Sequence, residues 1–343
     1  MLRTTIWLIL IILLNASSSI AYAQPKKVII DTDPGVDDAM ELVLTLQSPE
    51  IEIVGITITS GHINISQRTK NALRIVELSG KNIPVFQGAA KPLYVSTLFE
   101  GSDMVHGDDG LGNTAQPEPK IKAQQKSAAQ FIVEATKAHP GQITIIAEGR
   151  LTNLADAIRL DSSVTKNVKE VVVVAGALRV PGLVTPVAEP NAWMDPHAAD
   201  MVFTAAWKVT LFSLDVTMKV ALPDELLLRI KEKNLRFGAF IYSITRGYRD
   251  FQMNALHSAG IIDFGASAIL YMIDPTIFKF KKGPVRVVTE GIAIGQTIMP
   301  NLEFQIQIDP VTWKGKPLVS AAFEVDAERY LKLYEAIMVG KQR

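Results

Sequence analysis

The chain has 343 residues, of which 48% are hydrophobic and 20% are charged, and this is enough for a globular protein with a sizeable core. Its 35 basic and 35 acidic side chains cancel, which excludes a global field that would attract nucleic acid, an anionic membrane or a polyanionic substrate. The chain contains no cysteine, so disulfides and zinc held by thiolates are also excluded.

The first 23 residues have the pattern of a secretory signal peptide. A basic start at Arg3 is followed by an apolar run over residues 6–14 and by small residues at Ala21 and Ala23. The alternative is an uncleaved membrane anchor, but a span needs about 20 apolar residues. We therefore expect cleavage after Ala23, a mature domain over residues 24–343, and a secreted or periplasmic protein that is not held at the membrane.

Short β-branched runs alternate with longer amphipathic segments along the mature chain. Four runs have the composition of buried strands, at residues 27–31, 51–57, 143–147 and 170–175. Helical patterns follow the first two, over residues 37–47 and 66–80, the second with Ser66 as its N-cap and Gly80 at its end. Strand then helix, repeated, predicts an α/β fold with a mostly parallel central sheet flanked by helices, open and Rossmann-like.

Two long loops, residues 88–116 and 176–190, interrupt this alternation. No repeat and no linker divides the mature chain, so a single domain is expected. Loops of this length in a compact domain are usually functional or disordered, and their polar and turn residues favour function.

Four aspartates crowd into the segment VIIDTDPGVDDAMELVL, residues 28–44, where the first strand ends. Like charges this close repel, so a positive group is expected among them. Dense oxygen ligands favour a hard cation, and calcium accepts irregular oxygen coordination more readily than magnesium, the alternative metal. Helix capping would explain Asp37 and Asp38, but not Asp31 and Asp33.

A second alternative is the DxD motif of haloacid-dehalogenase-type phosphatases. That motif needs a threonine soon after the second aspartate and an acidic pair much later in the chain. Here Pro34 and Gly35 follow Asp33, and the acidic pair comes at once, which argues against this interpretation.

The segment resembles the DTDPGxDDAxAL signature of the inosine-uridine-preferring nucleoside hydrolase family. Other segments similar to the family follow in its order: VGITITSGHINISQRTKNALRIVELSG, IPVFQGAAKPL, HGDDGLG, LTNLADAI, AEPNAWMDPHAA and PVRVVTEGIAIGQT. The resemblance covers nearly the whole mature chain. It implies a calcium-dependent N-ribohydrolase that assembles as a homo-oligomer, either a dimer or a tetramer.

The resemblance implies a Ca²⁺ site made by Asp33, Asp38, a main-chain carbonyl at Glu148 and an aspartate from the C-terminal third of the chain. Asp263 is the candidate for that last ligand. Asp33 would also take the proton of a water held by calcium, since a ligand carboxylate can accept a proton at neutral pH. Asp31 would support the site from behind.

Ribose contacts are implied at Asp37, Glu189 and Asn191, where carboxylates and amides stabilise the charge that develops on the sugar as the bond to the base breaks. His106, in a Gly-rich loop, matches a family histidine near the substrate and is a second candidate catalytic residue. From the residues alone, Glu189 could instead be a surface charge, Asn191 a helix cap and His106 a solvated loop residue.

The chain departs from the family pattern at three places. His62, a candidate substrate contact, stands in place of an asparagine whose donor and acceptor it cannot copy, and Leu183 replaces an asparagine near the 5′ end of the sugar. Before IDPTIF the family has His-Asp, but the register here falls on Phe264 and Gly265, with Asp263 two residues early.

The missing histidine is the usual acid for a leaving purine. His257 is a possible substitute, although a solvated or core role is the alternative. Trp193 and Tyr248 could stack on a base or could serve only in packing.

The expected function is calcium-dependent hydrolysis of the N-glycosidic bond of a ribonucleoside or related riboside to free base and ribose. The alternative is a non-catalytic riboside-binding protein that keeps the calcium site but has lost activation of the leaving group.

Overall fold

The computed structural model describes residues 24–61, 63–94, 104–300 and 310–340. The expected signal peptide, residues 1–23, and the predicted substrate contact His62 lie outside the described residues.

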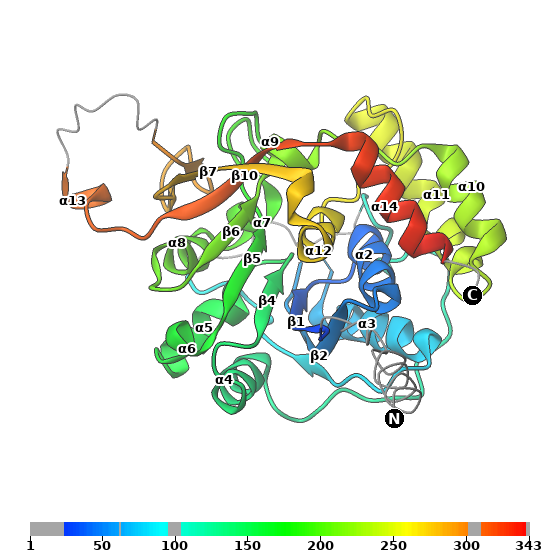
Figure 1. The fold of residues 1–343 in the computed structure, drawn as a ribbon, viewed down its shortest axis with the longest axis horizontal. Helices are drawn as coiled ribbons and strands as arrows, with labels where there is room; N and C mark the ends of the chain where they lie inside the picture. The colour runs from blue at the N-terminus through cyan, green and yellow to red at the C-terminus, as the bar shows by residue number, and fades with distance from the viewer. Residues whose placement is uncertain (1–23, 62, 95–103, 301–309, 341–343) are drawn as a thin grey trace, which may run out of the picture.

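Eight strands form one sheet in the order β3-β2-β1-β4-β5-β6-β10-β7 (Figure 1). All neighbouring strands are parallel except β10 and β7, which are antiparallel. The prediction of a mostly parallel sheet flanked by helices is confirmed, and the four predicted strands are β1, β2, β4 and β5. The bounds are β1 (Lys26–Thr32), β2 (Ile51–Ile58), β3 (Val85–Gln87), β4 (Thr144–Ala147), β5 (Glu170–Val174), β6 (Val209–Phe212), β7 (Phe278–Gly283) and β10 (Val319–Val325).

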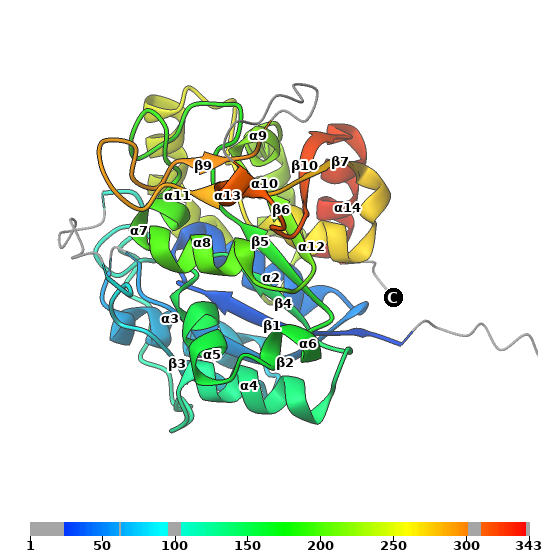
Figure 2. The same ribbon diagram turned by 90° about the vertical axis from the view of Figure 1, so that its left-hand side faces the viewer.

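Both faces of the sheet are covered by helices (Figures 1 and 2). Successive residues of a strand point to opposite faces, so Val28 and Ile30 of β1 join one hydrophobic core and Ile29 joins the other. The first core is closed by α2 (Val36–Gln47), α3 (Ile65–Ser79), α10 (Asp224–Lys233), α11 (Gly238–Ala255), α12 (Ala266–Ile273) and α14 (Ala327–Val339). The second is closed by α4 (Ala128–Ala138), α5 (Thr152–Leu160), α6 (Val164–Asn167) and α8 (Pro196–Thr204).

The remaining elements are short, and some of them add buried residues to the two cores, such as Val216, Ile277 and Val287. A separate antiparallel pair joins β8 to β9. The bounds are α7 (Pro190–Met194), α9 (Leu214–Thr217), η1 (Pro275–Ile277), β8 (Arg286–Val287), β9 (Thr297–Ile298) and α13 (Pro310–Trp313).

The ends of α3 follow from local chemistry. Gly80 ends the helix with a left-handed φ of 68°, as predicted, because glycine reaches this conformation without strain. The predicted N-cap, Ser66, is wrong. Asn64 caps the helix instead, its side-chain oxygen accepting a hydrogen bond from the backbone of Gln67 at 3.0 Å, and Ile65 is the first helical residue.

The strand order decides where a ligand can bind. From β1 the chain builds outward to β2 and β3 on one side, and then returns to build β4, β5 and β6 on the other side. In open parallel sheets such a reversal leaves a crevice beyond the carboxyl ends of the two central strands, here β1 and β4. The acidic segment of residues 31–38 runs directly into this crevice.

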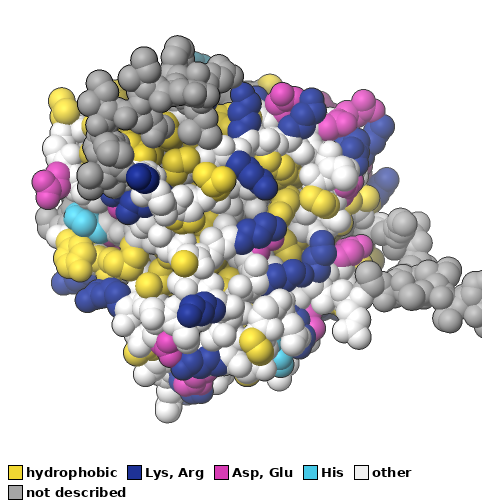
Figure 3. Space-filling model, turned by 60° about the vertical axis from the view of Figure 1, so that its left-hand side comes forward, with side chains coloured by type: hydrophobic (Ala, Val, Ile, Leu, Met, Phe, Trp, Pro, Cys, Tyr) yellow, Lys and Arg dark blue, Asp and Glu magenta, His cyan; other side chains and the backbone are white. Residues whose placement is uncertain are grey.

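The face of the molecule drawn in Figure 3 shows both basic and acidic side chains scattered among hydrophobic ones. Within the part of the chain that the structure describes, no helix combines the length and the apolar character that a membrane span requires.

Candidate active site

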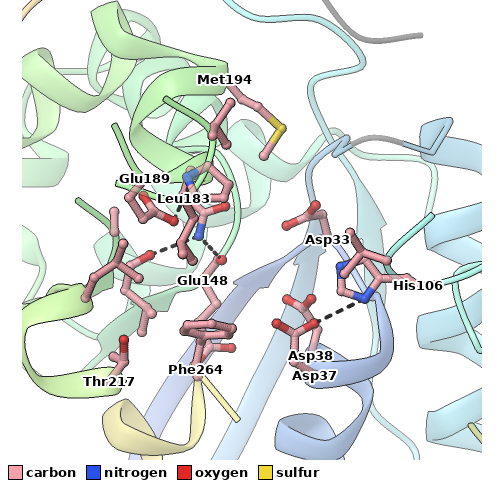
Figure 4. Close-up of a pocket in the computed structure, with 18 of the residues that line it drawn as sticks. Asp33, Asp37, Asp38, His106, Glu148, Leu183, Glu189, Met194, Thr217 and Phe264 are labelled. Carbon is pink, nitrogen blue, oxygen red and sulfur yellow. Dashed lines mark hydrogen bonds and ion pairs between the residues drawn. The ribbon is translucent and has the colours of Figure 1, made fainter. Parts of the chain in front are cut away.

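A cavity of about 370 Å³ lies beyond the carboxyl ends of the central strands, within the size range of small-molecule sites. Side chains from both sides of the switch point face each other across it, those from β1 and α2 opposite those that follow β4 and β5 (Figure 4). Its lining includes six acidic side chains, Asp33, Asp37, Asp38, Glu41, Glu148 and Glu189, among many apolar ones.

Asp33 lies directly after β1, and its carboxyl group fits between two glycines. A Cβ atom added to Gly61 or to Gly149 would collide with a carboxyl oxygen of Asp33. The Arg68 guanidinium donates to the main-chain oxygen of Asp33 at 2.5 Å and lies 3.9 Å from its carboxyl group. Burial, and next the neighbouring charge of Asp38, raise the pKa of Asp33 well above its ordinary value. The site therefore holds the Asp33 carboxyl group in a fixed position.

The next two acids begin helix α2. Asp38 accepts a hydrogen bond from the Thr32 hydroxyl at 2.6 Å and another from the backbone of Gly35 at 3.2 Å. Asp37 lies 3.6 Å from Nδ1 of His106, and that nitrogen also accepts from the backbone of Val36 at 3.2 Å. Burial raises the pKa of Asp37. The long loop thus brings His106 to the pocket, where it stacks on Tyr248 with 5.2 Å between ring centres.

Asp31 lies below the pocket and does not line it. Its carboxyl group is buried and accepts hydrogen bonds from Thr57 at 2.6 Å and from Asn153 at 2.7 Å. Burial raises the pKa of Asp31 to about 7. These contacts tie β1 to β2 and to the start of α5, which is the supporting position predicted for this residue.

Glu189 and Asn191 enter from the second long loop and α7. The Glu189 carboxylate is buried and accepts from the backbone of Gly176 at 2.7 Å, of Asn191 at 2.9 Å and of Ala192 at 3.0 Å, so it is the N-cap of α7 rather than a surface charge. The Asn191 amide donates to the main-chain oxygens of Glu148 and Val174. Both side chains are therefore held rigidly at the rim of the pocket.

Among the described residues, one acidic group could hold a metal ion: Asp38, Glu41 and Glu148, with one oxygen from each within 4.8 Å of the others. Oxygens that share one Ca²⁺ at about 2.4 Å can be no more than about 4.8 Å apart, so the spacing fits. All four carboxyl oxygens of Glu41 and Glu148 are buried without a hydrogen-bond partner. Burial, followed by the charges of Asp38 and Asp263, raises the pKa of Glu41 well above its ordinary value. The group has the donor set that a hard divalent cation requires.

The structure does not bring Asp263 into this group. Its carboxyl group is buried just before α12, accepts a hydrogen bond from the Tyr334 hydroxyl at 2.9 Å and another from the backbone of Ala266 at 3.3 Å. It is absent from the described lining of the pocket, to which Phe264 and Gly265 contribute instead. One oxygen of the expected ligand is thus held by α14 and the other by the first residue of α12.

The apolar part of the pocket includes several of the residues singled out from the sequence. Leu183, Trp193, Tyr248 and Phe264 all line it. His257 is exposed on the turn after α11 and does not line it, so the structure gives no support to this residue as the missing acid. Among the described residues of the lining, His106 is the only histidine.

Sequence reasoning missed Glu41 and two arginines. Glu41 lies within an apolar helical run and stands where the family signature has alanine, which was the available signal. Arg68 and Arg150 are both buried, and their charges act on Asp33. Arg150 donates to the main chain and the hydroxyl of Ser60. No local pattern pointed to either arginine.

Comparison with known proteins supports this geometry. The profile described as "Inosine-uridine preferring nucleoside hydrolase" matches residues 28–332. The chain is 37% identical over 313 residues to uridine nucleosidase 1 of Arabidopsis thaliana, covering 91% of this chain and 92% of that protein. It is 34% identical over 278 residues to the inosine-uridine preferring nucleoside hydrolase of Crithidia fasciculata, covering 80% and 87%.

The fold leads to the same group of proteins. A solved plant nucleoside hydrolase superposes with a TM-score of 0.89 at 34% identity, over 92% of this chain and 100% of that one. The strand order, the acidic crevice and the sequence match over most of the chain therefore all point to the same family. The chain belongs to the inosine-uridine preferring nucleoside hydrolase family and is an N-ribohydrolase, an enzyme that hydrolyses ribonucleosides to free base and ribose.

Proposed function

We propose that the enzyme depends on Ca²⁺ bound among the carboxylates beyond β1 and β4. The observation that carries this proposal is the set of buried, unpartnered carboxyl oxygens of Glu41 and Glu148 beside Asp38. Uncompensated carboxylates in a protein interior are costly, and a divalent cation would offset their repulsion. When bound, such a cation supplies Lewis-acid activation of water and of the ribose hydroxyls.

Asp33 is the general base in this proposal. Its carboxylate accepts a proton from the attacking water while the water oxygen forms a bond to the anomeric carbon of the ribose. The bond from that carbon to the base nitrogen breaks, and its electron pair leaves with the base. The Arg68 guanidinium, 3.9 Å from the Asp33 carboxyl group, favours its charged form, and the two glycines beside it keep the carboxylate in place.

The ribose is held between the two sides of the pocket. Asp37 and Glu189 present carboxylates, and the Asn191 amide, whose nitrogen is engaged, presents its oxygen. Negative and polar groups fixed around the sugar stabilise its positive charge in the transition state without reorganising. Rigid attachment of Glu189 to three backbone amides makes it suited to this role.

The base would lie against Trp193 and Phe264 in the apolar part of the cavity. Phe264 can donate no proton to a leaving purine, so we expect uridine to be cleaved faster than inosine. Uridine is also named in both curated relatives described above. In this proposal His106 contacts the ribose side of the substrate, and its position 3.6 Å from Asp37 supports that role.

The test is release of free base and ribose from uridine, cytidine, inosine and guanosine by protein purified as residues 24–343 with CaCl₂. Asp33→Asn should lower kcat by about 10²- to 10⁴-fold, the usual contribution of a general base, with an unchanged circular dichroism spectrum. Exposed Asp108→Asn is the matched control and should retain full activity. Near-normal turnover by Asp33→Asn, or nucleoside binding without turnover by the unaltered enzyme, would contradict the proposal.

A further inference from the structure

We propose that the side chain of Glu41 is itself a metal ligand and that it takes the position which a side chain at residue 265 would otherwise occupy. The inference rests on the proposed metal-dependent function and names a ligand for the same site. It follows from how α2 and the start of α12 meet over the end of β4.

Glu41 is a buried carboxylate without a structural partner. It lies one helical turn after Asp37 and Asp38 on the same face of α2, is 0% exposed, and neither carboxyl oxygen has a hydrogen-bond partner. The charged groups that act on it are Asp38, Asp263 and Asp37, all of them acidic. Nothing among the described residues compensates this charge, so the group is suited to a cation.

Glu41 also lies next to Glu148, the other carboxylate of the group without a hydrogen-bond partner. An oxygen of Glu41, one of Glu148 and one of Asp38 lie within 4.8 Å of one another. Glu148 follows β4, whereas Glu41 and Asp38 belong to α2, so the three ligands converge from the two halves of the sheet. This is the convergence that a cation needs and that helix capping does not explain.

Gly265 gives the independent geometric argument. A Cβ atom built on Gly265 would lie closer than 3.0 Å to Oε2 of Glu41 and 2.9 Å from Oε1 of Glu148, distances that real Cβ atoms do not show. Any side chain at residue 265 would therefore enter the space of these carboxylates. In the register of the family resemblance this position carries an aspartate and position 41 an alanine, so the carboxylate is supplied here from α2 and the space is kept open by glycine.

Asp263 is less suited than Glu41 to be a ligand of this metal site. Its two oxygens accept hydrogen bonds from Tyr334 and from the backbone of Ala266. Reaching the group would break the buried hydrogen bond to α14. Glu41 needs no such rearrangement, because one of its oxygens already lies within 4.8 Å of an oxygen of Asp38 and of Glu148.

Calcium binding by titration calorimetry on EDTA-stripped protein tests the inference without relying on turnover. Glu41→Gln should weaken Ca²⁺ binding by at least about tenfold, the lower end of the loss caused by removing even an outer partner of a metal ligand. Its melting temperature without metal should be unchanged or higher, because a buried carboxyl group without a hydrogen-bond partner is replaced by an amide of about equal size. Exposed Glu52→Gln on β2 is the matched control and should bind Ca²⁺ normally.

A double-variant cycle then tests whether the carboxylate ligand at residue 41 takes the place of one at residue 265, which we call the exchange of position. Gly265→Asp alone should weaken Ca²⁺ binding, because its side chain collides with Glu41. Glu41→Ala should weaken it as well, and Glu41→Ala combined with Gly265→Asp should bind more tightly than either single variant. Asp263→Asn should bind as the unaltered protein does.

The results separate this inference from the proposed function. If the unaltered protein binds no calcium, the metal-dependent function fails. If it binds calcium and Glu41→Gln binds equally well, the metal site stands and the assignment of Glu41 is overturned. A Glu41→Ala/Gly265→Asp protein that binds no better than Glu41→Ala would overturn the exchange of position.

Discussion

Two buried aspartates beside the pocket differ in what surrounds their carboxyl groups. Asp33 has two arginine side chains acting on it and faces the cavity. Asp263 is 3% exposed, has a tyrosine hydroxyl as its side-chain partner and does not line the pocket. Burial raises the pKa of Asp263 to about 8. At the residue scale the carboxyl group of Asp33 faces the cavity, whereas that of Asp263 holds its proton inside the fold.

Asp263→Asn should change how stability depends on pH in metal-free protein. The unfolded carboxyl group, with a pKa of 3.8, releases its proton while the folded one retains it up to about pH 8. Its contribution to stability is therefore complete below about pH 4, is lost as pH rises through the folded pKa, and is constant above it. Between about pH 4 and pH 8 the unaltered protein should lose stability relative to the variant. The free energy of unfolding of Asp263→Asn, minus that of the unaltered protein, should therefore rise by about 1.4 kcal/mol per pH unit.

Urea unfolding in EDTA at pH 5, 6, 7 and 8 measures this slope. Exposed Asp108→Asn serves as the control and should run parallel to the unaltered protein. Parallel stability curves for Asp263→Asn and the unaltered protein would show that Asp263 already ionises freely in the folded state.

At the scale of single elements, helix α3 shows how a cap is chosen. Asn64 and Ser66 are both exposed, and both are residue types that favour an N-cap. The choice falls on Asn64 because Ile65 is buried in the core and so must already belong to the helix. The helix then carries Arg68 toward Asp33 and Asn71 toward the main-chain oxygen of Pro34.

Asn64→Ala should lower the free energy of unfolding by about 1 kcal/mol, because the backbone N–H of Gln67 loses its acceptor. Ser66→Ala should leave it unchanged or slightly higher, since serine caps nothing here and alanine is the better helix former. Guanidinium unfolding of the two variants and the unaltered protein measures these free energies. The reverse order of effects would restore Ser66 as the cap.

Local patterns predicted four of the strands, the helices after the first two of them and the aspartates of residues 31–38, because burial periodicity and charge density are properties of adjacent residues. The ligand role inferred for Glu41 could not be predicted in this way, since within its apolar run it has the appearance of an ordinary helical residue. The orientation of Asp263 is set by Tyr334, 71 positions away in sequence. Contacts of that range depend on the packing of α12 against α14, which no local pattern encodes.

At the scale of the whole molecule, the proposed ligands come from two different elements of the fold. Asp38 and Glu41 belong to helix α2, whereas Glu148 follows strand β4. A cation held between them would bind the folded chain and not the unfolded one, because the three carboxylates converge only after the sheet has formed. Metal binding should therefore stabilise the entire domain.

Calcium should accordingly raise the melting temperature of EDTA-stripped protein more than magnesium does. A ligand at about 100 times its Kd adds about 2.7 kcal/mol to stability, which in a chain of this size corresponds to a rise of about 4 °C. Magnesium demands near-octahedral ligands and gives up its water reluctantly, whereas carboxylates from two separate elements form an irregular site that suits calcium. Scanning calorimetry with each chloride salt, and with sodium chloride at matched ionic strength as the control for screening, measures the difference. An equal or larger rise with magnesium would overturn the calcium assignment, and no rise with either would show that the acidic group holds no cation.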